Sequence, residues 1–340
     1  MKILLLAGGD SSEREVSLAS GLAIYESLKR QEHTVFAIDP LSGKSLLGSD
    51  GSFLTDSPNN NGRTAATVKT DTRALTNAIT SPGFKDVEVV FIALHGGSGE
   101  NGSIQCLLEL AGKKFTGSNM TASAIAMNKA VTKRLFASED ILTPKWKLYR
   151  MLPDADTHAI GHDTSENFEF PVIVKPNDSG STVGLTKAKD YNELRPALIK
   201  AAEESPNILV EEFIDGRELT VAVLDGQPLP VVEIIPTNEL YDYEAKYTRG
   251  KSRYVAPAEI DPAIAAGMSS AAVTATAVIG ATGLVRVDFI MDKKERCYCL
   301  ELNTLPGMTK LSLAPMAAGA TGIDFDELTD RMIKSSLEGR

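Results

Sequence analysis

The sequence predicts an α/β domain built on a doubly wound parallel sheet, followed by two domains of the α+β class. Three observations lead to this prediction. Compact apolar strands alternate with helical segments early in the chain, as in parallel sheets that are covered on both faces. Strand pairs joined by short turns occur only later, and they favour antiparallel sheets. The length of 340 residues exceeds what one hydrophobic core usually supports.

The first expected domain covers residues 1–117. Its helix is predicted over Glu13–Leu28, and Leu41–Thr72 is rich enough in Gly, Ser, Thr, Asn and Asp to predict an excursion or long loop. The expected strands are Lys2–Ala7, His33–Asp39, Val87–Leu94 and Lys114–Gly117. Their alternation with helices predicts a sheet with helices on both faces.

The second expected domain covers residues 118–212 and is small. The expected helices are Thr121–Glu139 and Tyr191–Glu204. The expected loops are Met151–Glu169 and Asp178–Gly184. The expected strands are Phe170–Pro176 and Asn207–Ile214.

The third expected domain covers residues 213–340. Asp225-Gly226 is a strong hairpin signal, and the charged turn Asp292–Arg296 predicts a second hairpin. The expected strands are Glu218–Leu224, Pro228–Ile235, Leu284–Met291 and Cys297–Asn303. The expected helices are Ala263–Ala281, Ser312–Ala320 and Asp324–Leu337. The segment Pro236–Ala258 is long, polar and aromatic, which predicts a functional loop.

The composition argues against several classes of protein. A net charge of −10 gives no basic footprint for nucleic acid. The apolar start ends at Gly8 without the layout of a signal peptide, and we expect no membrane span, so the sequence predicts a cytoplasmic protein. Three cysteines argue against a disulfide framework. Cys297 and Cys299 alternate along a strand, which favours burial over metal binding.

The second hairpin gathers oxygen ligands on one face. Arg286 and Asp288 share a face of its first strand. On the return strand, Glu301 and Asn303 are expected to share one face, and Leu300 and Leu302 the other. Asp288 should therefore lie opposite Glu301 within a residue or two of register. Two carboxylates and an amide oxygen suit a hard cation such as Mg²⁺.

For the hairpin alone, a solvated polar face with an arginine–carboxylate pair explains the pattern equally well. The following segment favours a site. Arg286 would hold a phosphoryl group or a developing oxyanion. Gly307 can bring a backbone N–H close to a ligand, and Ser312 is the expected N-cap of a helix, where a carboxylate would bind.

Lysines predict a phosphate site. Lys175 ends an apolar strand and precedes the loop Asp178–Gly184, whose N–H groups and hydroxyls could wrap a triphosphate. The loop does not match a P-loop, and the chain start does not match the dinucleotide fingerprint, which argues against an oxidoreductase. Lys129 and Lys246 are further candidates, although a lone lysine is usually a surface charge.

These motifs together resemble those of the D-alanine–D-alanine ligases of the ATP-grasp superfamily. The family's carboxy-terminal signature is similar to Arg286–Phe289, then Glu301–Thr309 and Ser312-Leu313. Its earlier signature resembles His95–Gly102, and its start resembles Gly8–Ser17. Four dispersed motifs in one order are far more specific than any one of them. The resemblance implies an ATP-grasp fold preceded by a doubly wound amino-terminal domain.

The resemblance also implies a role for each matching residue. The metal ligands would be Asp288, Glu301 and Asn303, holding two Mg²⁺ ions, with Mn²⁺ as an alternative. ATP would be bound by Lys129, Lys175, Thr182, Glu211, Phe213, Glu218 and Lys246. D-alanine would be bound by Glu13, His95, Arg286, Ser312 and Leu313. The catalytic groups would be an oxyanion hole of Arg286 and Gly307 N–H and a lid-closing triad of Glu13, Ser181 and Tyr247.

The implied reaction joins two D-alanines through an acyl-phosphate, with ATP as co-substrate, for peptidoglycan precursors. The resemblance further implies a homodimer and leaves open a monovalent cation. Three positions depart from the residues that are common in the family. Phe213 replaces tryptophan and keeps the apolar wall, and Thr182 replaces serine and keeps the hydroxyl. Asn101 replaces aspartate. The base that deprotonates the incoming ammonium is not evident.

Two alternatives remain at this point. One is another ATP-grasp ligase of a carboxylate and an amine, or a D-alanine–D-lactate or D-alanine–D-serine ligase; Tyr247 favours an amine acceptor. The other is a nucleotide-binding regulator without catalysis, which the intact set from Arg286 to Asn303 argues against.

Overall fold

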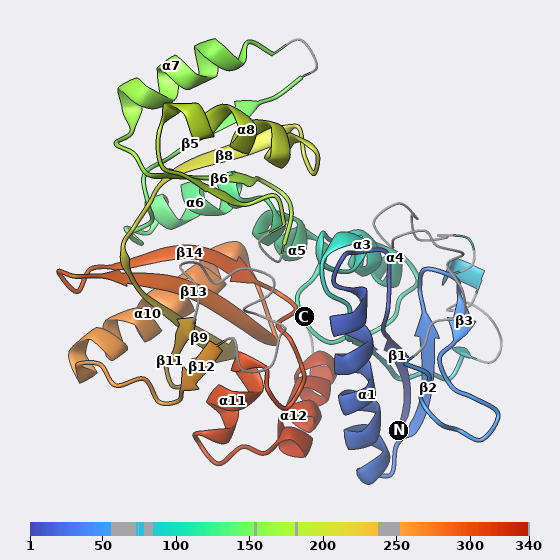
Figure 1. Cartoon of the computed structure of the whole chain (residues 1–340). Coiled ribbons are helices and arrows are strands. Elements are labelled where there is room, and N and C mark those ends of the chain that lie inside the picture. The colour runs from blue at the N-terminus through green and yellow to red at the C-terminus, as the bar shows by residue number, and fades with distance from the viewer. Residues whose placement is uncertain are drawn as a thin grey trace.

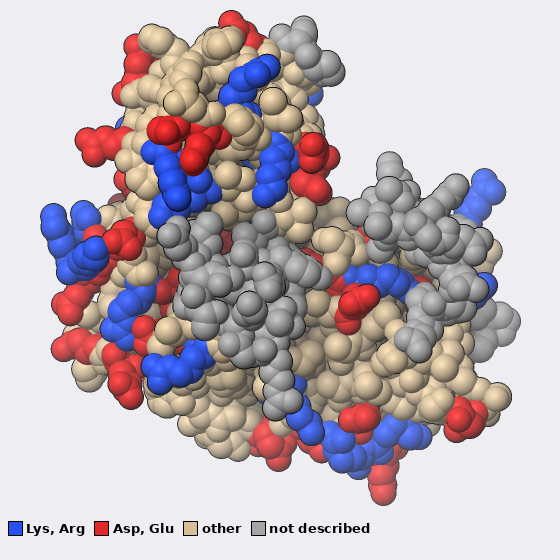
Figure 2. Space-filling model, viewed as in Figure 1, with Lys and Arg blue, Asp and Glu red and all other residues tan. Residues whose placement is uncertain are grey.

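The structure, a computed structural model, describes residues 1–55, 73, 75–77, 84–152, 155–180, 183–236 and 252–338. The described strands form three separate sheets, which lie in three lobes (Figure 1). In that view the amino-terminal sheet lies at the right, the central sheet at the top and the carboxy-terminal sheet at the lower left. Acidic and basic side chains are interspersed over the described part of this face (Figure 2).

The amino-terminal sheet has the order β3-β2-β1-β4, and β2, β1 and β4 run parallel. Its strands are β1 Lys2–Leu6, β2 Thr34–Asp39, β3 Lys44–Ser45 and β4 Val89–Ile92. Ile3 packs toward α1 (Arg14–Arg30), whereas Leu4 packs toward α4 (Ser103–Leu110) on the opposite face. Both faces are covered, which confirms the doubly wound prediction. Within the described residues, the expected strand Lys114–Gly117 is reduced to an isolated parallel bridge with β4.

The central sheet is antiparallel, with the order β5-β8-β6-β7. Its strands are β5 Trp146–Arg150, β6 Val172–Pro176, β7 Thr186–Ala188 and β8 Asn207–Glu212. Helices α7 (Thr157–Asn167) and α8 (Tyr191–Ala202) cover one face, where Val172, Val174 and Val210 belong to a hydrophobic core. The opposite face borders a cavity.

The helix predicted over Thr121–Glu139 is wrong as a single element. It is two helices, α5 (Met120–Met127) and α6 (Lys129–Ser138). Asn128 between them has an extended backbone, with φ −87° and ψ 92°, and its Oδ1 accepts a hydrogen bond from Val131 N–H. A side chain that caps the start of a new helix competes with continuation of the old one.

The loop predicted over Met151–Glu169 is also wrong, because most of it is α7. Asp156 caps this helix, and its Oδ1 accepts hydrogen bonds from the N–H groups of His158 and Ala159 at 2.9 and 3.1 Å. The buried positions of α7 are the small or polar residues Gly161 and Thr164. An apolar periodicity is therefore lacking, and the capping residue is the remaining signal.

The carboxy-terminal sheet has the order β12-β11-β9-β13-β14, with β10 paired to β9. Its strands are β9 Gly216–Leu224, β10 Gln227–Pro228, β11 Val232–Pro236, β12 Ser252–Val255, β13 Leu284–Asp292 and β14 Cys297–Asn303. Its helices are α10 Pro262–Ile279, α11 Leu313–Gly319 and α12 Phe325–Glu338. The pairs β9–β10 and β13–β14 confirm both predicted hairpin turns. The expected strand Pro228–Ile235 is wrong as a single element, because it is divided into β10 and β11.

Among the described helices, α10 is long and apolar enough to cross a membrane by length and composition alone. This corrects the expectation that the chain has no such stretch, and the cause is the high alanine content of α10. Met268 and Ala272 of α10 are buried in one core with Val287 and Phe289 of β13. In this fold, α10 covers one face of the carboxy-terminal sheet.

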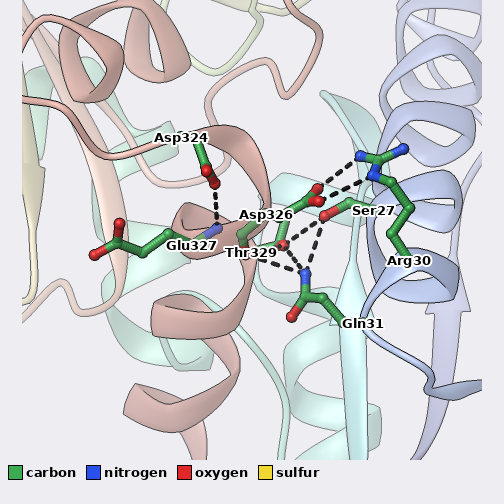
Figure 3. A network of polar contacts seen from close by, with 7 residues as sticks. All are labelled: Ser27, Arg30, Gln31, Asp324, Asp326, Glu327 and Thr329. Carbon is green, nitrogen blue, oxygen red and sulfur yellow. Dashed lines mark hydrogen bonds and ion pairs between the residues drawn. The ribbon is translucent and has the colours of Figure 1, made fainter.

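The first and last described helices lie side by side (Figure 3). The guanidinium of Arg30 on α1 donates to both carboxylate oxygens of Asp326 on α12, at 2.9 and 2.6 Å. Next to this pair, the buried hydroxyls of Ser27 and Thr329 lie 2.8 Å apart. Residues of β1, α1, α11 and α12 belong to one hydrophobic core. The amino-terminal lobe therefore shares its core with the final helices.

Candidate active site

A cavity of about 200 Å³ lies between the central sheet and the carboxy-terminal sheet. The predicted site residues that line it are Lys129, Lys175, Glu211, Phe213, Glu218, Arg286, Asp288, Glu301 and Leu313. They come from α6, β6, β8, β9, β13, β14, α11 and the segment after β8. The fold thus brings the expected nucleotide residues and the expected metal residues to one place.

The second hairpin places Asp288 directly opposite Glu301 and Arg286 opposite Asn303, which fixes the register that the sequence left open. The pairing shifts between Asp288 and Phe289, because Phe289 lies opposite Cys299 and β14 carries Leu300 as an extra residue. This bulge corrects the prediction that Leu300 shares a face with Leu302. Leu300 lines the cavity beside Glu301, whereas Leu302 is buried in the core with Cys299.

Asp288 is held by two neighbours. Arg286 donates through Nε and Nη2 to the two carboxylate oxygens, both at 2.8 Å, and Thr220 Oγ1 donates to Oδ1 at 2.7 Å. Both members of the ion pair are largely buried, with side-chain exposures of 15% and 18%. A bidentate pair of this kind keeps both groups oriented toward the cavity.

Lys129 joins three parts of the site. It is the first residue of α6, and its Nζ donates to the carbonyl oxygen of Ser179 in the glycine–serine loop at 2.7 Å. The same Nζ lies 3.3 Å from Glu301 Oε2 on β14. The break at Asn128 starts α6 at this position, so the helix boundary that the sequence missed is the one that presents the lysine.

Glu211 on β8 lies between two lysines. Lys175 Nζ is 2.7 Å from Oε2, and Lys133 Nζ is 2.8 Å from Oε1. Burial by itself raises the pKa of the Glu211 carboxyl, but the two lysines outweigh it and hold the pKa below its ordinary value. Nearby, the Lys187 ammonium lies 3.7 Å from the centre of the Phe213 ring. Sequence reasoning found Lys175, Glu211 and Phe213 but missed Lys133.

The donor set of the hairpin fits a hard divalent cation. Asp288 and Glu301 offer carboxylate oxygens from paired strands, and Asn303 offers an amide oxygen that already accepts a hydrogen bond from Leu305 N–H at 2.8 Å. Within the described ranges, no three His, Cys, Asp or Glu side chains form a metal cluster. The oxygen-only set of two carboxylates and one amide suits Mg²⁺ that also binds phosphates.

A second group of predicted residues lies at the carboxyl ends of the amino-terminal strands. Glu13 precedes α1 and is only 7% exposed. A Cβ atom at Gly96 would lie 2.8 Å from Glu13 Oε2, and one at Gly180 would lie 3.1 Å from the same oxygen. These two glycines therefore leave space beside the carboxylate, and Gly180 brings the glycine–serine loop of the central lobe to it.

The loop that presents Glu13 is held by a buried ion pair. Asp39 accepts from Arg14 Nη2 at 2.6 Å and Nη1 at 3.1 Å, and its Oδ1 also accepts from Gly9 N–H. Gly8 has a positive φ of 92°, and a Cβ there would lie 2.8 Å from Arg14 Nη1. Glycine is required at this position for both reasons.

His95 links the two groups of residues. Its Nε2 lies 3.0 Å from Ser20 Oγ on α1, and its Nδ1 lies 2.9 Å from the carbonyl oxygen of Leu305 after β14. Burial lowers the pKa of His95, against the attraction of the Glu13 carboxylate. The imidazole is thus a fixed bridge between the amino-terminal lobe and the segment that carries Gly307.

Glu100 is a buried acidic residue that the sequence did not single out. It ends the short helix α3 (Gly97–Glu100), is 7% exposed, and its Oε2 accepts from Gly96 N–H at 2.9 Å. Burial, and then the charges of Glu13 and Glu301, raise its pKa to about 7. The expected signature His95–Gly102 contained this residue, but a raised pKa depends on neighbours that are distant in sequence.

Gly307 and Ser312 are in contact. A Cβ at Gly307 would lie 2.8 Å from Ser312 Oγ, and the same Oγ accepts from Thr309 N–H at 3.0 Å. Ser312 occupies the N-cap position of α11, as predicted, without a hydrogen bond from its side chain to the helix. Leu313 follows it and lines the cavity.

Four predicted site residues lie outside the described residues, namely Ser181, Thr182, Lys246 and Tyr247. Most of the predicted lid loop Pro236–Ala258 also lies outside them, because residues 237–251 are not described.

Comparisons with known proteins find two family models that together match most of the chain. The family models for the D-ala D-ala ligase N-terminus and C-terminus match residues 2–118 and 135–334. A D-alanine–D-alanine ligase of Gloeobacter violaceus is 42% identical over 99% of this chain and 100% of its own, and one of Magnetococcus marinus is 39% identical over 98% and 97%.

Two solved structures are similar along the whole chain. The D-alanine–D-alanine ligase of Bacillus anthracis complexed with ATP has a TM-score of 0.78 and 29% identity, covering 99% of this chain and 97% of its own. The VanG D-Ala:D-Ser ligase of Enterococcus faecalis has a TM-score of 0.77 and 28% identity, covering 99% of each chain.

Proposed function

This chain belongs to the D-alanine–D-alanine ligase family, with an ATP-grasp fold, and we propose that it joins two D-alanines by way of an acyl-phosphate at the cavity between its central and carboxy-terminal sheets. The reaction is an ATP-dependent ligation that serves the synthesis of peptidoglycan precursors. The observation that carries the proposal is the convergence of Lys129, Lys175 and Arg286 on a cavity that Asp288 and Glu301 also line.

The candidate residues would each bind a different part of ATP or the metal ions. Lys129 and Lys175 would hold the α- and β-phosphates of ATP, and Lys246 the γ-phosphate. Glu211 and Phe213 would hold adenine, and Glu218 the ribose. Asp288, Glu301 and Asn303 would hold two Mg²⁺ ions. Bound Mg²⁺ supplies positive charge to the phosphate oxygens as charge develops on them.

The first chemical step activates a carboxylate. Glu13 would bind the ammonium of the first D-alanine, with His95 beside it, so that the carboxylate faces the cavity. A carboxylate oxygen attacks the γ-phosphorus, the bond to ADP breaks, and an acyl-phosphate results. Arg286 would turn from Asp288 toward the transferring phosphoryl group.

The second step forms the amide. Ser312 and Leu313 would bind the second D-alanine, whose free amine attacks the carbonyl carbon of the acyl-phosphate. Arg286 and the N–H of Gly307 would stabilise the oxyanion of the tetrahedral intermediate, and inorganic phosphate then leaves. The closeness of Gly180 to Glu13 supports closure of the glycine–serine loop, which contains Ser181, over the site. Tyr247 of the lid loop would join Glu13 and Ser181 in the closed state.

The test is phosphate release from ATP and Mg²⁺ with D-alanine, D-serine, D-lactate or L-alanine, with each product identified by mass. We expect phosphate in proportion to D-alanyl-D-alanine. If the main product were D-alanyl-D-serine, this chain would instead have the acceptor preference named for the VanG D-Ala:D-Ser ligase. Binding of ATP without phosphate release under any of these conditions would refute the proposal in favour of a regulator.

Three further expectations belong to the proposal. We place the enzyme in the cytoplasm, as a homodimer with ATP and D-alanine as its small-molecule partners.

A requirement for Mn²⁺ or a monovalent cation can be tested by adding each ion to enzyme treated with a chelator. Domains of 1–117, 118–212 and 213–340 can be tested by limited proteolysis.

A further inference from the structure

Three buried charged side chains form a cluster beside the cavity, and one of them has no role in the proposed reaction. Lys133 on α6 is completely buried, with an exposed side-chain fraction of 0%, against 3% for Glu211 and 9% for Lys175. Its Nζ donates to Thr143 Oγ1 at 2.6 Å and lies 2.8 Å from Glu211 Oε1. Lys175 and Glu211 line the cavity, and Lys133 lies behind them.

We propose that Lys133 is a positioning residue that acts as the permanent counter-ion of Glu211, so that Lys175 is free to leave this carboxylate and bind a phosphate of ATP. The inference rests on the proposed function, in which the cavity binds ATP. It assigns the two lysines different tasks although both contact one carboxylate.

The argument depends on charge balance. Two lysines lie beside one carboxylate, so the positive groups of this cluster outnumber the negative ones. When Lys175 turns to a phosphate, Lys133 and Glu211 remain as a balanced pair. Without Lys133, the same movement would leave a buried carboxylate without a cation, which is strongly unfavourable. Lys175 would then remain on Glu211.

The two lysines also differ in burial and in their other contacts. Lys133 is completely buried and its Nζ donates to the Thr143 hydroxyl, so we expect its ammonium to stay beside Glu211. Lys175 is the second-last residue of β6 and the more exposed of the two, and it lines the cavity near the glycine–serine loop that is expected to close over the phosphates. The fold thus places the fixed cation behind the carboxylate and the exchangeable one in front of it.

The test is a double-mutant cycle on ATP binding. The dissociation constant of ATP, with MgCl₂, is measured by titration calorimetry for wild type, Lys133→Met, Glu211→Gln and the double variant. Methionine preserves the length of the lysine side chain without its charge. Lys147→Met is the control, because Lys147 lies on the same lobe in a half-exposed ion pair with Asp163.

We expect Lys133→Met to weaken ATP binding at least about tenfold. The same change in the Glu211→Gln background should alter the constant less than about threefold, because the charge that needs a counter-ion is gone. In turnover assays, Lys133→Met should raise KM for ATP and leave KM for D-alanine within about twofold. Lys147→Met should bind ATP as the wild type does.

Equal ATP affinity of wild type and Lys133→Met would overturn the inference. So would a loss in the Glu211→Gln background as large as in the wild-type background. If Lys133→Met does not fold, Lys133→Gln, which also removes the charge, takes its place in both backgrounds of the cycle. Failure of the wild type to bind ATP would instead refute the proposed function, so the two failures are distinguishable.

Discussion

Replacing Glu100 by glutamine should remove a pH dependence from the free energy of unfolding. The carboxyl of Glu100 is buried at the end of α3, where burial, and then the charge of Glu13, raise its pKa from 4.5 to about 7. Glutamine cannot ionise, and its amide oxygen can still accept the hydrogen bond from Gly96 N–H. The variant therefore imitates the protonated acid.

The sign and size follow from linkage. Below pH 4.5 the carboxyl is protonated in both folded and unfolded chains. Between pH 4.5 and about 7 the folded chain keeps a proton that the unfolded chain has released, so the free energy of unfolding falls as the pH rises. The full loss is roughly 3 kcal/mol, because each pKa unit corresponds to about 1.4 kcal/mol. Above about pH 7 the carboxyl is ionised in both states and the loss is complete.

Urea unfolding of wild type and Glu100→Gln at about pH 5 and about pH 8 measures this quantity. The free energy of unfolding of the variant minus that of the wild type should increase by roughly 2.5 kcal/mol between the two conditions, because part of the full loss already occurs below about pH 5. Glu203→Gln, at an exposed position after α8, is the control and should show no such change. A difference between variant and wild type that is equal at both pH values would refute the assigned environment of Glu100.

Three other changes test separate parts of the structure. Asp288→Ala should lower kcat by at least about a hundredfold with an unchanged circular dichroism spectrum, and near-normal turnover would contradict its assignment as a metal ligand. Asp39→Ala should cost about 3–5 kcal/mol in urea unfolding, because it leaves the buried Arg14 guanidinium without its carboxylate. Thr329→Val should lower the free energy of unfolding by about 1–3 kcal/mol, because it removes a buried hydroxyl contact with Ser27. Arg30→Ala should lower it by less than about 1 kcal/mol, because the Arg30–Asp326 pair is half-exposed. The reverse order would refute this interpretation of the helix contact.

The strand pattern was sufficient to predict most of the fold. Apolar strands and the turn signals at Asp225-Gly226 and Asp292–Arg296 predicted the parallel sheet and both hairpins. The helix boundary at Asn128 was missed because its cap competes with a strong helical pattern on both sides. Helix α7 was missed because its buried positions carry small and polar side chains.

The candidate site was predictable where the chemistry is local. Asp288 and Glu301 follow from strand parity and one turn, although Leu300 shows that a single bulge reverses parity beyond it. The partners of buried charges were not predictable. Lys133 and Glu100 acquire their environments from residues on other elements, and no local pattern records which carboxylate or lysine will lie beside them.

The pairing of α1 with α12 has a consequence for how the chain is made. Ser27 and Thr329 are 302 positions apart, and β1 shares its core with α11 and α12. A ribosome adding about 5–20 residues per second needs roughly 15–60 s to cover that interval. During this time the emerging amino-terminal lobe has an apolar face whose permanent cover has not been translated. Chaperones that bind early apolar surfaces should therefore act on this lobe first, and ribosome-bound chains that stop before α11 should remain sensitive to protease there.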